Sequence, residues 1–198
     1  PRLSRSTPQS CSSGTGPSLA DGGALFNATA VSTAGGHKNL LTAALSSAEW
    51  ETVCTAVYNQ PLLIKQAAGS YGTGPKMALN PRYLLVPRAL QLTAMKVLYP
   101  GWENGSNIHS ENQQRGLPGD VVTVPEWTDS NDWAALCDPR LAPAIFVGER
   151  FGLMPEVFIA GEETSPAVFT NDEHRLKVRH FLAVWVNDFR PLHKSNVA

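Results

Sequence analysis

The chain has 198 residues, 42% of them hydrophobic, which is enough for one ordinary domain or for two small domains that share an interface. Its 16 Lys and Arg residues nearly balance 17 Asp and Glu residues, so the formal net charge is −1. This balance argues against a dedicated nucleic-acid binder and against a polybasic membrane-surface protein, because both carry a cationic excess. Charged residues make up only 17% of the chain, below the roughly 25% that is usual, which favours a surface that is covered by something else, for example by further copies of the chain.

The first 24 residues are rich in Ser, Gly, Pro and Thr and contain almost no large apolar residue. Such a segment cannot bury enough surface to offset its ordering entropy, so the composition predicts a flexible arm or linker over residues 1–24. An arm of this kind could also become ordered by lying on a neighbouring subunit.

A helix is predicted from Ser46, because Ser46 and Glu49 form a capping box. Apolar residues then recur at helical spacing until Gln60 and Pro61 end the helix. The predicted buried face consists of Trp50, Val53, Cys54, Val57 and Tyr58.

The residues from Tyr83 to Val86 predict a short buried strand that leads into a second helix at Pro87, where the missing amide costs nothing. The predicted buried stripe of that helix is Leu90, Ala94, Val97 and Leu98. The polar range 101–119 predicts a long exposed loop, and Asn104-Gly105 is a turn or hairpin signal within it.

Short strands are predicted at 121–124, 144–147 and 157–160, separated by Pro and Gly turns. From Leu176 to Asn187 the residues alternate with period two, which predicts one extended strand of roughly 40 Å. Few small enzymes need so long a strand, whereas shells and extended sheets use them.

The three cysteines, Cys11, Cys54 and Cys137, are far apart and form no CxxC pair, which excludes a cysteine-based zinc site and favours reduced thiols. Cys54 and Cys137 have apolar neighbours and are predicted to be small core residues. No stretch approaches 18 consecutive apolar residues, so no membrane-spanning helix is predicted.

No catalytic, cofactor-binding or metal-binding residue is predicted, and no cofactor is expected. The glycine-rich range 69–74 lacks the Lys and helix start of a phosphate-binding loop and predicts a flexible turn. His109 and Glu111 are expected to be a solvent-facing pair. His174 and His180 lie about 20 Å apart on an extended strand, too far to bind one metal ion.

Several motifs occur in the same order as in the major capsid proteins of tailed phages, most closely the Mu-like major head subunits and the prohead protease–capsid fusion proteins. The run from Asn80 to Pro87 and its following helix resemble a strand-and-helix motif of that family. Further resemblances are Ala24–Phe26 with His37–Leu40, Val121–Pro125 with Trp133 and Cys137–Pro139, Phe151–Glu156, and Lys177–Arg179 with Asp188–Arg190 and Lys194. Each motif alone is weak, but together they span roughly residues 21–194.

The resemblance implies an α+β protein with the tailed-phage capsid (Johnson) fold, in which a peripheral domain joins an axial domain. The implied organisation is a flexible arm or linker over 1–24, a peripheral-domain segment with one helix over 25–79, an axial domain over 80–165 and return strands of the peripheral domain over 166–198. Within these ranges, 101–119 is a candidate for the axial rim and 166–190 for the long peripheral strands.

The sequence departs from this family at its start. In the family an N-terminal arm, an extended loop and a long spine helix precede the Leu25-Phe26 segment, whereas here only about 24 residues do. We therefore expect the C-terminal part of a capsid protein, with those three elements missing or supplied elsewhere, for example by a separate chain of a processed or split polypeptide.

By resemblance the chain is a structural, non-enzymatic protein that assembles into hexamers and pentamers of an icosahedral shell around double-stranded DNA, which it contacts only weakly and non-specifically. Further implied partners are scaffold, portal or decoration proteins, and no membrane. The implied location is the virion, after assembly in the host cytoplasm. Two alternatives stay open, an encapsulin-like compartment and an intracellular α+β hydrolase with His109, Glu111 or Asp120 in a loop-built cleft.

Overall fold

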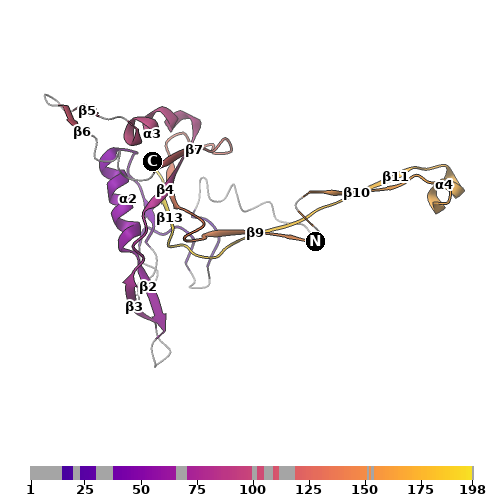
Figure 1. Cartoon of the computed structure of the whole chain (residues 1–198), viewed down its shortest axis with the longest axis horizontal. Helices are drawn as coiled ribbons and strands as arrows, with labels where there is room; N and C mark the ends of the chain where they lie inside the picture. Colours follow the sequence, from indigo (N-terminus) through magenta and orange to yellow (C-terminus); the bar gives the residue numbers. More distant parts are fainter. Residues whose placement is uncertain are drawn as a thin grey trace. The chain divides into compact units, whose positions relative to one another are not determined.

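The computed structural model describes residues 15–19, 23–29, 38–65, 71–99, 102–104, 109–111, 119–150, 152 and 154–197. The chain divides into two compact units. We call residues 1–144 together with 186–198 the sheet unit, and Ile145–Trp185 the ribbon unit (Figure 1). The described elements are α-helices and many short strands, a mixed α+β protein as predicted.

The sheet unit is built on a five-stranded mixed sheet with the strand order β1-β13-β8-β4-β7. Its strands are β1 (Leu40–Leu41), β13 (Leu192–Ser195), β8 (Trp133–Cys137), β4 (Pro81–Val86) and β7 (Asp120–Thr123). The two outer pairs, β1 with β13 and β4 with β7, are parallel, whereas β13 with β8 and β8 with β4 are antiparallel. The last described strand of the chain, β13, therefore lies inside the sheet and not at its edge.

Helix α2 (Ser47–Asn59) begins where the capping signal predicts. The Ser46 side chain accepts a hydrogen bond from the Glu49 amide at 3.2 Å, which satisfies one of the free donors of the first turn. The predicted buried face is confirmed for four of its five residues. It is wrong for Tyr58, which lies at the margin of the apolar stripe and is 44% exposed.

The second helix also begins at the predicted place, but its first turn is tighter than expected. Pro87 precedes a 3-10 turn, η1 (Arg88–Leu90), which continues into α3 (Gln91–Leu98). Ala94, Val97 and Leu98 are buried, as predicted, whereas Leu90 is only half-buried.

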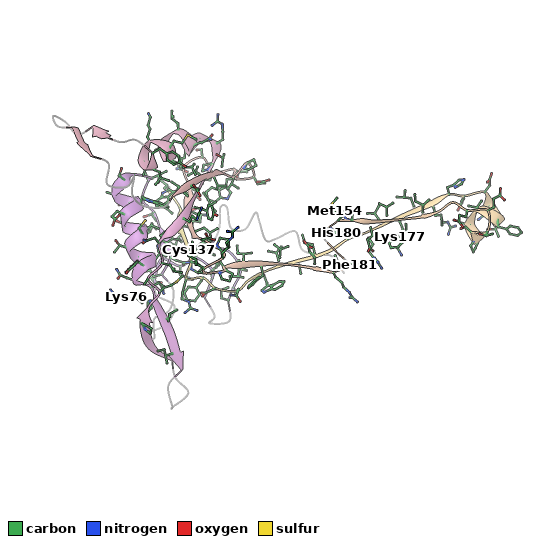
Figure 2. All side chains as sticks on the ribbon, in the orientation of Figure 1. Lys76, Cys137, Met154, Lys177, His180 and Phe181 are labelled. Carbon is green, nitrogen blue, oxygen red and sulfur yellow. The ribbon has the colours of Figure 1, made fainter. Side chains whose placement is uncertain are left out.

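Apolar side chains cover both faces of the sheet, because successive residues of a strand point to opposite faces. On β8, Trp133, Ala135 and Cys137 join the core formed with α2, α3 and β4; Cys137 is labelled in Figure 2. Leu136, between them, packs into a second cluster around Leu25, Phe26, Ala144 and Leu192. The predicted core positions of Cys54 and Cys137 are confirmed.

Two hairpins extend the sheet unit. The first pairs β2 (Pro61–Lys65) with β3 (Tyr71–Lys76), so the predicted flexible turn over 69–74 is wrong from position 71 onward, and positions 69 and 70 lie outside the described residues. The second pairs β5 (Trp102–Asn104) with β6 (His109–Glu111). It confirms the hairpin signal at Asn104-Gly105 and places two short strands within the predicted loop.

The ribbon unit is a succession of paired strands with a helix between them in the chain. Strand β9 (Ile145–Arg150) pairs with β12 (Phe181–Val186), and β10 (Glu156–Ala160) pairs antiparallel with β11 (Arg175–Arg179) (Figure 1). Helix α4 (Pro166–Asn171) connects β10 and β11.

The prediction of one continuous strand from Leu176 to Asn187 is wrong in one respect. The chain is extended, but it leaves strand geometry at His180, so that β11 and β12 pair with different partners (Figure 2). Helix α4 occupies the start of the range 166–190, which the resemblance makes a candidate for the long peripheral strands.

The described part of the predicted arm is joined to the sheet unit. The amide of Leu25 donates to Pro17 O at 2.9 Å, and that of Phe26 donates to Thr15 O at 2.9 Å. Residues 1–14 lie outside the described residues. The assignment of the four sequence ranges to arm, peripheral and axial parts stays a prediction.

Candidate assembly surface

The motif residues of the sheet unit form its internal connections. Asn39 is buried, and its side-chain amide donates to Leu25 O at 3.0 Å and to Leu192 O at 3.2 Å. Its Oδ1 accepts from the Asn27 amide at 3.1 Å. The Asn39 side chain thus joins the Leu25-Phe26 segment to strand β13, whose residue Leu192 is 153 residues from Asn39 along the chain.

The motif residues Asp188, Arg190, Lys194 and Asp138 also make contacts within the sheet unit. Asp188 and Arg190 form an ion pair with Nε 2.9 Å from both carboxylate oxygens. Lys194 is buried, and its Nζ lies 3.0 Å from Oδ2 of the equally buried Asp132. The Asp138 carboxylate accepts from the Arg140 amide at 2.9 Å, which fixes the turn after β8. These residues stabilise the fold.

Of the three residues named for the hydrolase alternative, the structure describes the side chain of Asp120 alone. Asp120, on β7, lies 3.4 Å from the Arg82 guanidinium, which also lies 3.4 Å from Asp138. The backbones of His109 and Glu111 belong to β6, and their side chains lie outside the description. Within the part of the chain that the structure describes, no three His, Cys, Asp or Glu side chains could hold a metal ion.

A small pocket of about 160 Å³ lies beside α2, lined by Glu51, Cys54, Thr55, Tyr58, Asn59 and Asn80. Burial, with a smaller contribution from the Glu51 charge, raises the pKa of Cys54 to about 12. The thiolate, which is the reactive form, is therefore scarce at neutral pH. The pocket supplies no activated nucleophile.

The ribbon unit has the opposite character, because its apolar side chains are exposed. Ala167 is the single buried residue among those described in this unit. Fourteen large hydrophobic residues of the unit are exposed: Ile145, Phe146, Val147, Met154, Val157, Phe158, Ile159, Phe169, Leu176, Val178, Phe181, Leu182, Val184 and Trp185. An exposed apolar surface of this extent marks an interaction site in a folded protein.

The register of β10 and β11 separates this surface into two unlike faces. Residues directly opposite in an antiparallel pair share a face, and the pairs are Val157 with Val178 and Ile159 with Leu176. All four are more than half exposed, with Ile159 at 72% and Leu176 at 66%. We call these four residues the aliphatic face.

The other face of the same two strands is polar and partnered within the ribbon. Arg179 Nε donates to Glu156 at 3.0 Å, and Arg175 pairs with Glu173 at 2.9 Å. Lys177 and Arg179 lie over the Phe158 ring, 5.3 Å and 5.0 Å from its centroid, at cation–π distance. Figure 2 shows Lys177 on β11, near His180 and Phe181. We call this the polar face.

Strands β9 and β12 are joined by an aromatic contact. The rings of Phe146 and Trp185 lie 5.8 Å apart at an interplanar angle of 30°. Gly148 makes room for the indole, because a Cβ at this position would lie 2.6 Å from Trp185 Cζ3. This part of the ribbon is therefore ordered by its own side chains, although Trp185 is still 49% exposed.

The sequence patterns located strands β10 and β11 but did not reveal which residues share the exposed aliphatic face. The alternation from Leu176 onward places Leu176 and Val178 on one face, yet the cross-strand partners Val157 and Ile159 follow only from the register. No sequence signal identified the aliphatic face as exposed.

The comparisons with known proteins bear directly on this arrangement. A family model described as phage capsid protein matches residues 12–195. No curated protein matches the chain. Within the described helices, none is long and apolar enough to cross a membrane.

The family match covers both units, the motif residues that connect the sheet unit and the exposed surface of the ribbon unit. Capsid proteins are structural proteins of the virion that assemble in multiple copies, and an exposed apolar ribbon suits that task. The chain belongs to the phage capsid protein family.

Proposed function

We propose that this chain is a major capsid protein that self-assembles into an icosahedral shell enclosing double-stranded DNA. The observation that carries the proposal is the ribbon unit, which has a single buried residue among those described and fourteen exposed large hydrophobic ones. A two-stranded ribbon is marginally stable in water unless another surface covers it. Neighbouring copies in a shell supply that cover.

The physical mechanism is the addition of many weak contacts. Each copy buries loops and strand faces against several neighbours, and the closed shell gains stability through multivalency. The formal charge of −1 suits a wall that touches packaged DNA only weakly, because tight DNA binding requires a cationic surface.

The proposal also covers the type of capsid protein and its fold. We propose a Mu-like capsid protein with the Johnson fold, in which 80–165 form the axial part and 25–79 and 166–198 form peripheral parts. Its building units are hexamers and pentamers, and assembly takes place in the host cytoplasm. Scaffold, portal and decoration proteins, and a separate chain carrying an arm, extended loop and spine helix, are further proposed partners. Mass spectrometry of intact particles identifies any such second polypeptide.

The test is assembly of the full chain, followed by sedimentation and electron microscopy. We expect closed, symmetric shells, and nuclease-protected double-stranded DNA in particles isolated from infected cells. A chain that stays monomeric under all assembly conditions, with and without the proposed partners, contradicts the proposal. Shells that contain a defined cargo protein in place of DNA support the encapsulin-like alternative instead.

A further inference from the structure

The aliphatic face of the ribbon unit consists of Val157, Ile159, Leu176 and Val178. The register places them as two adjacent cross-strand pairs, so they form one compact apolar patch. All four are exposed. Helix α4, which follows β10 in the chain, has one buried residue, Ala167. The patch therefore has the composition of a core surface without a described cover.

We infer that the aliphatic face packs against the same face of a second copy of this chain, so that two ribbons meet face to face about a local twofold axis. This inference rests on the proposed function and names the surface through which two subunits of the assembly meet. Two apolar sheet faces pack in this way at about 10 Å, with interdigitating side chains.

The charges on the two faces of the ribbon favour packing of the aliphatic face, and not of the polar face, against the same face of a second copy. The four residues of the aliphatic face are uncharged, so a symmetric contact brings no like charges together. The polar face carries Arg175, Lys177 and Arg179 against the two carboxylates Glu156 and Glu173. Packing of that face against its own copy would bury three cations with only two carboxylates on each side, which disfavours it.

The small size of the aliphatic face implies that the contact forms only within the assembled lattice. Four residues per copy are far fewer than the roughly 20–30 residues a side of a stable independent interface. The contact is therefore too small to hold a free dimer and forms within the assembled lattice, where other contacts keep the two copies together.

Cysteine labelling tests the burial of the face. Cys54 and Cys137 are buried. In a Cys11→Ser background, the engineered cysteine of Ile159→Cys or Ala160→Cys is therefore the single accessible thiol. The two positions are adjacent on β10 and point to opposite faces. On assembly, maleimide labelling of Ile159→Cys should slow roughly tenfold or more, and that of Ala160→Cys should change little.

Charge substitution tests the identity of the partner surface. Ile159→Glu and Ile159→Lys should each reduce the yield of particles strongly, whereas Ala160→Glu, which faces Arg175 across the ribbon, should assemble like the parent chain. Because the patch is compact, a symmetric contact brings position 159 of one copy near position 159 of the other. Mixing the Glu and Lys variants should therefore restore assembly.

The outcomes separate this inference from the proposed function. If the parent chain forms shells while Ile159→Cys is labelled as fast as in the unassembled chain, or while Ile159→Glu assembles normally, the inference is wrong and the proposed function stands. If the face is protected but the mixed variants do not assemble, it packs against a different surface and the symmetric contact is wrong. Circular dichroism of the unassembled variants checks that each still folds.

Discussion

Lys194 and Asp132 form a fully buried ion pair, with Nζ 3.0 Å from Oδ2 and side-chain exposures of 1% and 0%. Asp132 Oδ1 also accepts a hydrogen bond from the Val197 amide at 2.9 Å. Since Lys194 lies on β13, the pair joins this inner strand of the sheet to the residue that precedes β8.

Removing one member of this pair should destabilise the protein strongly. Lys194→Met leaves the Asp132 carboxylate buried without its cation, and we expect a loss of about 3–5 kcal/mol in the free energy of unfolding. Chemical denaturation of the unassembled chain measures it. The double variant Lys194→Met/Asp132→Asn removes both charges and should recover most of the loss; equal instability of the single and double variants would contradict this explanation.

Asn39 provides a second test of the sheet unit. Asn39→Ala removes two donated hydrogen bonds and one accepted bond, leaving Leu25 O and Leu192 O without this donor, and should cost about 2–4 kcal/mol. Asn39→Asp should be no better, because a carboxylate cannot donate to those carbonyls. Thermal unfolding of both variants measures the effect, and a loss of less than 1 kcal/mol (about one hydrogen bond) in Asn39→Ala would argue against the role assigned to Asn39.

The two buried tryptophans should respond differently to the same substitution. Trp133 Nε1 donates to Ala43 O at 3.0 Å, whereas Trp50 Nε1 is buried without a partner among the described residues. Both rings belong to one core cluster, 6.4 Å apart. Trp133→Phe should therefore cost about 1 kcal/mol more than Trp50→Phe. Equal losses in matched denaturation curves would show that packing alone determines the cost.

His193 should make the stability of the sheet unit depend on pH. Burial lowers the pKa of His193 from 6.5 to about 4. Between these values the unfolded chain binds a proton that the folded chain does not, so stability is fully present above pH 6.5 and falls as the pH is lowered. We expect the wild type to lose about 2 kcal/mol relative to His193→Gln between about pH 7 and 5. Parallel stability curves for the two proteins across this range would contradict the assignment.

How much of this structure could be predicted depends on the kind of signal each segment carries. Helix α2 was found because Ser46 and Glu49 mark its start and Trp50, Val53 and Val57 repeat at helical spacing. Strand β13 was missed because His193, Lys194 and Ser195 are polar, although all three are buried. Their burial depends on partners distant in sequence, such as Asp132, which no local pattern contains.

The ribbon unit illustrates the same limit for the candidate surface. Period-two alternation located β11 and β12, but it could not reveal the break at His180, where the pairing partner changes from β10 to β9. Helix α4 has only six residues, too few for a periodic signal, and Pro166 at its start was its one local marker. The two faces became visible only once Val157 and Ile159 were aligned with their partners across the ribbon.

The most direct test of the central claim, that this chain builds a shell in which neighbouring copies cover the ribbon unit, is a cryo-electron microscopy map of assembled particles. The account predicts closed shells in which Val157, Ile159, Leu176 and Val178 of every ribbon are covered by protein from another copy. Shells in which these four side chains face solvent, or a preparation that contains only folded monomers, would contradict it.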